Sequence, residues 1–144
     1  MKMSRSKSIF FEELSLFSSE NEDFKLLDVT KCDNFWEIGR LSTIEGLLQK
    51  KLNTYIYEST GERIVIKKNF FNSAIANILS VLGASFIGQA FGELFTIVID
   101  GKEVGIFIVN RLTKKSEFKI NDSTFKIKDD LLTVLFVIHQ NQVE

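Results

Sequence analysis

The feature that most constrains this chain is a long stretch without charge: no acidic or basic residue lies between Lys68 and Glu93. Its length satisfies the roughly 20 residues that a bilayer span needs. Its amide side chains satisfy that environment poorly, because Asn72, Asn77 and Gln89 would each require hydrogen-bond partners in hydrocarbon. Residues 70–92 therefore indicate either a soluble fold that encloses an apolar helix or a membrane-inserted protein.

The spacing within this stretch favours a helix with two distinct faces. At about 100° per residue, large apolar side chains gather on one face, while small residues recur every four positions on another. Hairpin sequences flank the stretch, and a single membrane span would place them on opposite sides of the bilayer. We therefore expect a buried helix, with membrane insertion of residues 70–92 as the alternative. The small residues are Ala76, Ser80, Ala84, Gly88 and Gly92.

The rest of the chain is patterned as short strands joined by tight turns. Gly61 suits a turn that needs a positive φ, and Asp100-Gly101 is a strong signal for a type I′ hairpin turn. Hairpins are predicted over 54–68, 94–109 and 116–128; further strands are predicted over 9–17, 24–29, 34–41 and 131–139; and 42–52 could be a strand or a helical turn. The sequence thus predicts one mainly β (β-rich α+β) domain over 1–144, whose antiparallel hairpins form a barrel-like sheet around one central apolar helix.

Charge is unevenly distributed, although the net charge is only −1. The segment 9–34 is acidic, and the segment 111–128 is basic. In the predicted third hairpin, Phe118 and Ile120 alternate with Lys119, which indicates a buried apolar face and a basic outer face. The candidate ligand-binding residues are therefore Arg111, Lys114, Lys115, Lys119, Lys126 and Lys128.

Signatures of catalysis and of metal binding are missing from the sequence. There is one histidine, His139, and one cysteine, Cys32, with no HExxH, CxxC or GxSxG motif. We interpret His139 as structural or surface-exposed, Trp36 as a core or rim residue, and Asp129-Asp130 as part of a turn. The expectation is a protein that is not an enzyme and that uses no cofactor or metal. The lone cysteine and the lack of a secretory signal predict a cytoplasmic location, with peripheral membrane association.

Three segments resemble the tubby C-terminal-like superfamily, which includes the LURP-one-related proteins and the phospholipid scramblases. They are "YIYESTGERIVIKK", "DGKEVGIFIV" and "SEFKINDSTFKIKDDLLTVLFVI", within residues 53–139. The resemblance implies a closed barrel of β-hairpins around one hydrophobic helix, usually near the C-terminus, whereas the apolar stretch here is central. It also implies a binding module without shared catalytic residues, in some members for phosphoinositides or membranes.

The combined expectation is a non-catalytic module that binds an anionic membrane headgroup or a protein partner through the basic hairpin. Nucleic acid is disfavoured, because the domain is not basic overall and no aromatic residues interleave with these lysines on the predicted outward face of the hairpin. Two alternatives stay open: a protein that inserts residues 70–92 into the membrane, and an inhibitor or immunity-type protein that neutralises another protein through its acidic N-terminal part.

Overall fold

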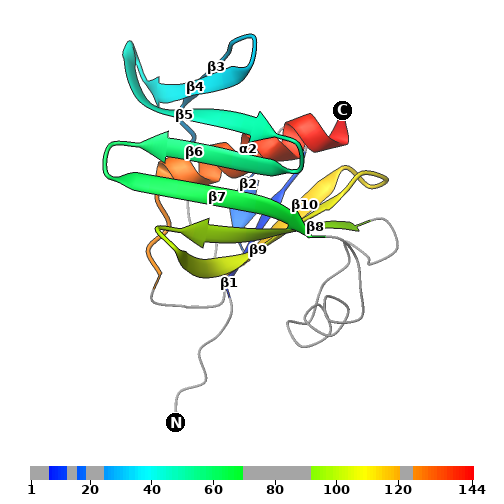
Figure 1. The fold of residues 1–144 in the computed structure, drawn as a ribbon. Helices are drawn as coiled ribbons and strands as arrows, with labels where there is room; N and C mark the ends of the chain where they lie inside the picture. The colour runs from blue at the N-terminus through cyan, green and yellow to red at the C-terminus, as the bar shows by residue number, and fades with distance from the viewer. Residues whose placement is uncertain (1–6, 13–15, 19–24, 70–91, 121–124) are drawn as a thin grey trace.

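Ten strands form one antiparallel sheet that packs on a single C-terminal helix in the part of the chain that the structure describes (Figure 1). This computed structural model describes residues 7–12, 16–18, 25–69, 92–120 and 125–144. The strand order is β2-β1-β10-β9-β8-β7-β6-β5-β4-β3. The elements are β1 (Lys7–Phe11), β2 (Leu16–Ser18), β3 (Asp28–Lys31), β4 (Phe35–Arg40), β5 (Thr43–Lys51), β6 (Thr54–Ser59), β7 (Glu62–Asn69), β8 (Gly92–Ile99), β9 (Lys102–Asn110), β10 (Lys115–Ile120) and α2 (Asp129–Val143).

The first two predicted hairpins are confirmed. β6 pairs with β7 around Gly61, whose φ is 79°, and β8 pairs with β9 around Asp100 and Gly101, whose φ values are 49° and 84°. Positive φ at both central residues is the geometry that a type I′ turn requires. The ambiguous segment 42–52 contributes β5, which pairs with β4 and β6.

The N-terminal strands differ in extent from the prediction. The predicted strand 9–17 is divided into β1 and β2, which pair antiparallel with each other. Of residues 25–29, the described part of the predicted strand 24–29, only Asp28 and Val29 lie in β3, which continues to Lys31. The predicted strand 34–41 is confirmed as β4.

The third predicted hairpin is wrong. β10 pairs with β9 on one edge and with β1 on the other, so neither edge is left for a partner strand from residues 125–128. Those residues have no regular secondary structure. The expected solvent-facing position of Lys119 is also wrong, because this residue is only 8% exposed. Apolar and polar residues do alternate in β10, but this alternation does not reveal whether both faces of a strand are covered, and here residues 116–120 are all buried.

The predicted strand 131–139 is a helix. The segment has a continuous apolar run with several β-branched residues, a pattern shared by buried strands and by helices enclosed on all sides. In the structure it forms most of α2, which is buried at Leu131, Leu132, Thr133, Val134, Leu135, Val137, Ile138, His139 and Gln142. Asp129 and Asp130 form the first turn of this helix, where carboxylates interact favourably with the helix dipole; they are not part of a separate turn.

Contacts from widely separated parts of the chain hold α2 in place. Leu27 N–H donates to Thr133 Oγ1 at 2.9 Å, Tyr55 O–H donates to Gln142 Oε1 at 2.6 Å, and Ser116 Oγ lies 2.6 Å from His139 Nδ1. Figure 1 shows α2 behind β5 and β6. Because a helix that is apolar on all sides must be buried on all sides, these contacts explain why α2 lies within the hydrophobic core formed with the sheet.

The prediction is confirmed only as a mainly β fold, and the buried helix that the structure describes is the C-terminal α2. The edge strands β2 and β3 do not pair with each other, so the described sheet is not a closed barrel. The predicted central helix, 70–92, lies outside the described residues except for Gly92, which begins β8. In the described part of the chain, no helix has both the length and the apolar character needed to cross a membrane.

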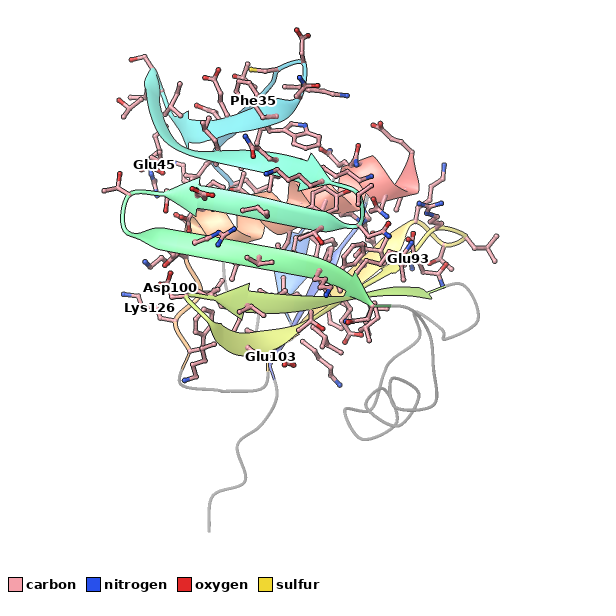
Figure 2. All side chains as sticks on the ribbon, viewed as in Figure 1. Phe35, Glu45, Glu93, Asp100, Glu103 and Lys126 are labelled. Atoms are coloured by element: carbon pink, nitrogen blue, oxygen red, sulfur yellow. The ribbon has the colours of Figure 1, made fainter. Side chains whose placement is uncertain are left out.

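Antiparallel pairing sorts the turns into two sets. β3, β5, β7 and β9 run in one direction, so the β3–β4, β5–β6 and β9–β10 turns and the C-terminal end of β7 lie at the same end of the sheet. The β4–β5, β6–β7 and β8–β9 turns lie at the other end. Figure 2 shows the two ends, with Glu93 at the first and Asp100 and Lys126 at the second.

Candidate functional site

The structure separates the six predicted basic residues. Arg111 and Lys114 lie in the β9–β10 turn, and Lys115 begins β10, so these three remain together. Lys126 and Lys128 lie at the other end of the sheet, where Lys128 Nζ is 3.0 Å from Glu62 Oε2. With Lys119 buried in β10 as well, no single surface displays all six.

Two lysines that the sequence reasoning missed lie at the same end as Arg111. Lys50 and Lys51 end β5 and precede the β5–β6 turn, and both are exposed. Neither turn sequence, "QKKLNT" at 49–54 or "NRLTKKS" at 110–116, contains an acidic residue. We call this surface the basic end and define it by Lys50, Lys51, Arg111, Lys114 and Lys115. In the sequence, the signal for this surface is a pattern that occurs in both turns: a leucine beside two or more basic residues.

The β9–β10 turn has a defined conformation. Asn110 Oδ1 accepts hydrogen bonds from Leu112 N–H at 2.9 Å and from Thr113 N–H at 3.1 Å. An asparagine side chain that bonds to backbone amides two and three residues later fixes a turn in this way. Lys114 closes the turn with a φ of 57°. The side chains of Arg111, Leu112 and Lys114 are therefore displayed from an ordered backbone.

Glu93 anchors the basic end to the helix. Its carboxylate side chain is 12% exposed and lies 2.5 Å from both Lys68 Nζ and Arg111 Nε. Gln142 Nε2 of α2 donates to the same carboxylate at 3.2 Å. Two bases share this one acid, so a positive charge remains after the pairing. The Nε of Arg111 is paired with Glu93, but the arginine side chain is still 61% exposed to solvent.

Tyr55 connects β6 to the C-terminal turn of α2 at this end. Its hydroxyl donates to Gln142 Oε1 at 2.6 Å and accepts from Asn141 Nδ2 at 2.7 Å. Burial raises the pKa of Tyr55, so the hydroxyl keeps its proton as a donor. Lys50 Nζ lies 5.5 Å from the centroid of the Tyr55 ring, within the range of a cation–π interaction. The same tyrosine thus positions both the helix and a lysine of the basic end.

A cleft of about 320 Å³ opens beside these groups, between the β3–β4 turn and β5. Lys31 and Lys50 contribute two positive charges to its lining, and Asp33 contributes one negative charge. Trp36 and Asn141 also line the cleft. Trp36 is half-buried, packs against the core and lies 6.5 Å from the Tyr55 ring centroid, which agrees with the core or rim position predicted for it.

A larger cleft of about 710 Å³ lies at the other end of the sheet, but its charges are largely neutralised. Arg40 pairs with Glu45 at 3.4 Å and with Asp129 at 3.2 Å, and Lys128 pairs with Glu62. The pKa of Lys128 is raised, chiefly by its hydrogen bond to Glu62. The described residues contain no group of three or more His, Cys, Asp or Glu side chains that could hold a metal ion. With four acids and three bases in its lining, this cleft has a net charge of −1 and does not offer a basic site to an anionic ligand.

The side chains most suited to acid–base or nucleophilic chemistry are the neighbouring pair His139 and Ser116, and Cys32. The pair is enclosed in the core, and the thiol is held by a hydrogen bond that lowers its reactivity. His139 and Ser116 are both 0% exposed, and the rings of Phe11 and Phe136 lie 6.3 Å and 6.2 Å from the imidazole. The Cys32 thiol donates to Glu37 Oε1 at 3.3 Å, and this hydrogen bond raises the pKa of the thiol. A raised pKa lowers the thiolate fraction and hence the reactivity of a cysteine.

The acidic N-terminal part does not form one described surface. Glu12 lies 3.8 Å from Lys115, and Asp28 Oδ2 accepts a hydrogen bond from Leu41 N–H at the other end of the sheet. Glu13, Glu20, Glu22 and Asp23 lie outside the described residues.

Comparison with known proteins found no matching family model, no matching curated protein and no matching solved structure.

Proposed function

We propose that this protein is a non-catalytic module that binds an anionic membrane surface through the basic end. The observation that carries the proposal is the convergence of two turns, far apart in the sequence, whose five bases are accompanied by no acid in either turn. A phospholipid surface is the partner that best matches charges spread over separate protruding turns. A protein partner with an acidic surface is the competing outcome.

The electrostatic contribution is sufficient for reversible binding. Each lysine or arginine near an anionic bilayer contributes about 1 kcal/mol, provided it lies within a Debye length of roughly 10 Å at 0.1 M salt. Lys51 and Lys114 are exposed, whereas Lys50, Arg111 and Lys115 also interact with protein groups. A total of about 3 kcal/mol is thus a reasonable expectation for five bases, and it should fall steeply with ionic strength.

The cleft beside the basic end supports recognition of a headgroup. Lys31 and Lys50 line it from two different strands, and Asn141 adds an amide from α2. Phosphate oxygens accept hydrogen bonds from ammonium and amide donors, so one phosphate could be bound here while the neighbouring turns meet the bilayer.

The position of α2 supports a relationship to the tubby C-terminal-like superfamily. The sequence predicts an apolar helix in the centre of the chain, at residues 70–92. The buried helix that the structure describes is α2, which is C-terminal, and the family usually has its enclosed helix near the C-terminus. We extend the proposal to a barrel-like enclosure of α2, supported by its contacts with β1, β6 and β10. Such a relationship would agree with membrane binding and with a non-catalytic role.

Charge reversal with a matched control tests the proposal. The Lys51→Glu/Lys114→Glu variant changes the basic end, and the Lys102→Glu/Lys126→Glu variant makes the same change in net charge at the other end, at exposed positions. Retention on vesicles of phosphatidylserine and phosphatidylcholine should fall at least tenfold for the first variant and less than twofold for the second. Equal losses would show attraction by net charge alone and would overturn the proposed surface.

Membrane fractionation and vesicle binding together separate the proposal from its two alternatives, which are insertion of residues 70–92 and binding to a protein partner. Release of the full chain from cell membranes by salt supports peripheral binding, while release only by detergent would indicate insertion of residues 70–92. Capture on an acidic protein surface with no retention on vesicles would indicate the protein partner instead.

A further inference from the structure

Two leucines protrude from the turns of the basic end. Leu52 is 92% exposed in the β5–β6 turn, and Leu112 is 69% exposed in the β9–β10 turn. Leu52 has a φ of 54°, a left-handed conformation that costs a non-glycine residue free energy. A leucine contributes nothing to the folded state at such a position, because it neither packs against the core nor favours the turn.

Charge distinguishes these leucines from a third one. Leu41 in the β4–β5 turn is 96% exposed and has a φ of 53°, so exposure and backbone conformation alone do not mark a site. The neighbouring Arg40 is paired with Glu45 and Asp129, and Asp28 accepts the hydrogen bond from Leu41 N–H. Leu41 therefore lies among acids, which an anionic surface would repel.

Leu52 and Leu112 each follow a base directly, as Leu41 does, but their turns each hold more than one base and no acid. Lys51 precedes Leu52, and Arg111 precedes Leu112, with Lys114 two residues further on. Long basic side chains can keep their charged groups at the level of the headgroups while a neighbouring apolar side chain enters the acyl region. The β5–β6 and β9–β10 turns are at the same end of the sheet, so both leucines lie at that end.

We propose that Leu52 and Leu112 insert into the bilayer while the bases of the basic end hold the headgroups. The inference rests on the proposed function and adds to it an apolar component that salt does not screen. It assigns the docked orientation as well: the β5–β6 and β9–β10 turns point to the membrane, and the turn with Leu41 points away from it.

Removal of each leucine should weaken binding without affecting the fold. Transfer of a leucine side chain out of water corresponds to about tenfold or more in a partition constant. Leu52→Ser/Leu112→Ser should therefore bind vesicles of phosphatidylserine and phosphatidylcholine at least tenfold more weakly, and the loss should persist at high salt. Leu41→Ser is the matched control and should bind within twofold of the parent protein.

A depth measurement makes insertion directly observable. The chain has one tryptophan, Trp36, so a Trp36→Phe background permits single probes at Leu52→Trp, Leu112→Trp and Leu41→Trp. Vesicles containing brominated lipid quench tryptophan only where the ring enters the acyl region. Probes at 52 and 112 should be quenched and blue-shifted on binding, and the probe at 41 should be unaffected; far-UV circular dichroism checks that each variant is folded.

The outcomes separate this inference from the proposed function. Binding that depends on Lys51 and Lys114, with no quenching at 52 or 112, would overturn insertion and leave the electrostatic surface intact. Equal quenching at 41 and 52 would overturn the docked orientation. Absence of vesicle binding by the parent protein would overturn both proposals.

Discussion

Two tyrosines of β6 allow a sharp test of how the sheet holds α2. Tyr55 and Tyr57 are both 0% exposed and lie two residues apart on the same face of the strand. The Tyr55 hydroxyl bonds to Gln142 and Asn141 of α2, whereas the Tyr57 hydroxyl lies near Asp130 but has no partner with good hydrogen-bond geometry among the described residues. Replacement of each by phenylalanine removes one oxygen atom and almost no volume.

The expected effects differ in size and in sign. Tyr55→Phe removes two hydrogen bonds and leaves Gln142 Oε1 buried without its donor, at a cost of about 2–3 kcal/mol in the free energy of unfolding. Tyr57→Phe removes a buried hydroxyl that gains nothing from burial, so the free energy of unfolding should stay constant or rise by up to about 1 kcal/mol.

Urea unfolding followed by Trp36 fluorescence and by far-UV circular dichroism measures both effects. Trp36 is a suitable reporter because it lies beside the Tyr55 ring. The free energy of unfolding falls by about 1–3 kcal/mol per molar urea, so Tyr55→Phe should lower the urea concentration at the unfolding midpoint by about 1 M or more. An equal loss in Tyr57→Phe would refute the reasoning, because it would show that the contacts between β6 and α2 do not distinguish the two hydroxyls.

The remaining predictions concern the ionisable groups at the two ends. Glu93→Gln should lower the free energy of unfolding by about 2 kcal/mol, because Lys68 and Arg111 lose their shared carboxylate. It should nevertheless tighten vesicle binding severalfold, because it removes one negative charge beside the basic end; weaker binding of the folded variant would contradict this. Burial raises the pKa of Asp130, so the folded state binds that proton more readily than the unfolded state, and the contribution of this group to stability should rise as the pH falls through the raised pKa and level off below the ordinary value of 3.8. Asp130→Asn should therefore be more stable than the parent at pH 7 and lose this advantage on acidification; a pH-independent difference in urea titrations would count against the assignment.

Local sequence patterns predicted the hairpins because their turns are decided locally. Asp100-Gly101 and Gly61 adopt the positive φ values that their residue types permit, and β6 and β7 around Gly61 alternate in burial as a half-buried sheet requires. The same rules could not identify Leu41 or Leu52 as turn residues with positive φ, because leucine is not favoured there. An unfavourable residue at such a position is informative only after the structure is known.

The errors came from tertiary context. A run such as Leu131–His139 satisfies both a buried strand and an enclosed helix, and only its surroundings decide between them. The predicted partner of β10 was wrong because β1, from the distant N-terminus, occupies that edge. The basic end was half predicted: Arg111, Lys114 and Lys115 were identified from local charge, but Lys50 and Lys51 join them only through the strand order.

The most direct test of the central claim is co-sedimentation of the unmodified protein with two kinds of vesicle, one containing phosphatidylserine and the other only phosphatidylcholine, across a salt series. Attachment through the basic end predicts strong retention on the anionic vesicles at low salt, a steep decrease as ionic strength rises, and little retention on the zwitterionic vesicles at any salt concentration. Equal retention on both vesicles, or none on either, would contradict it.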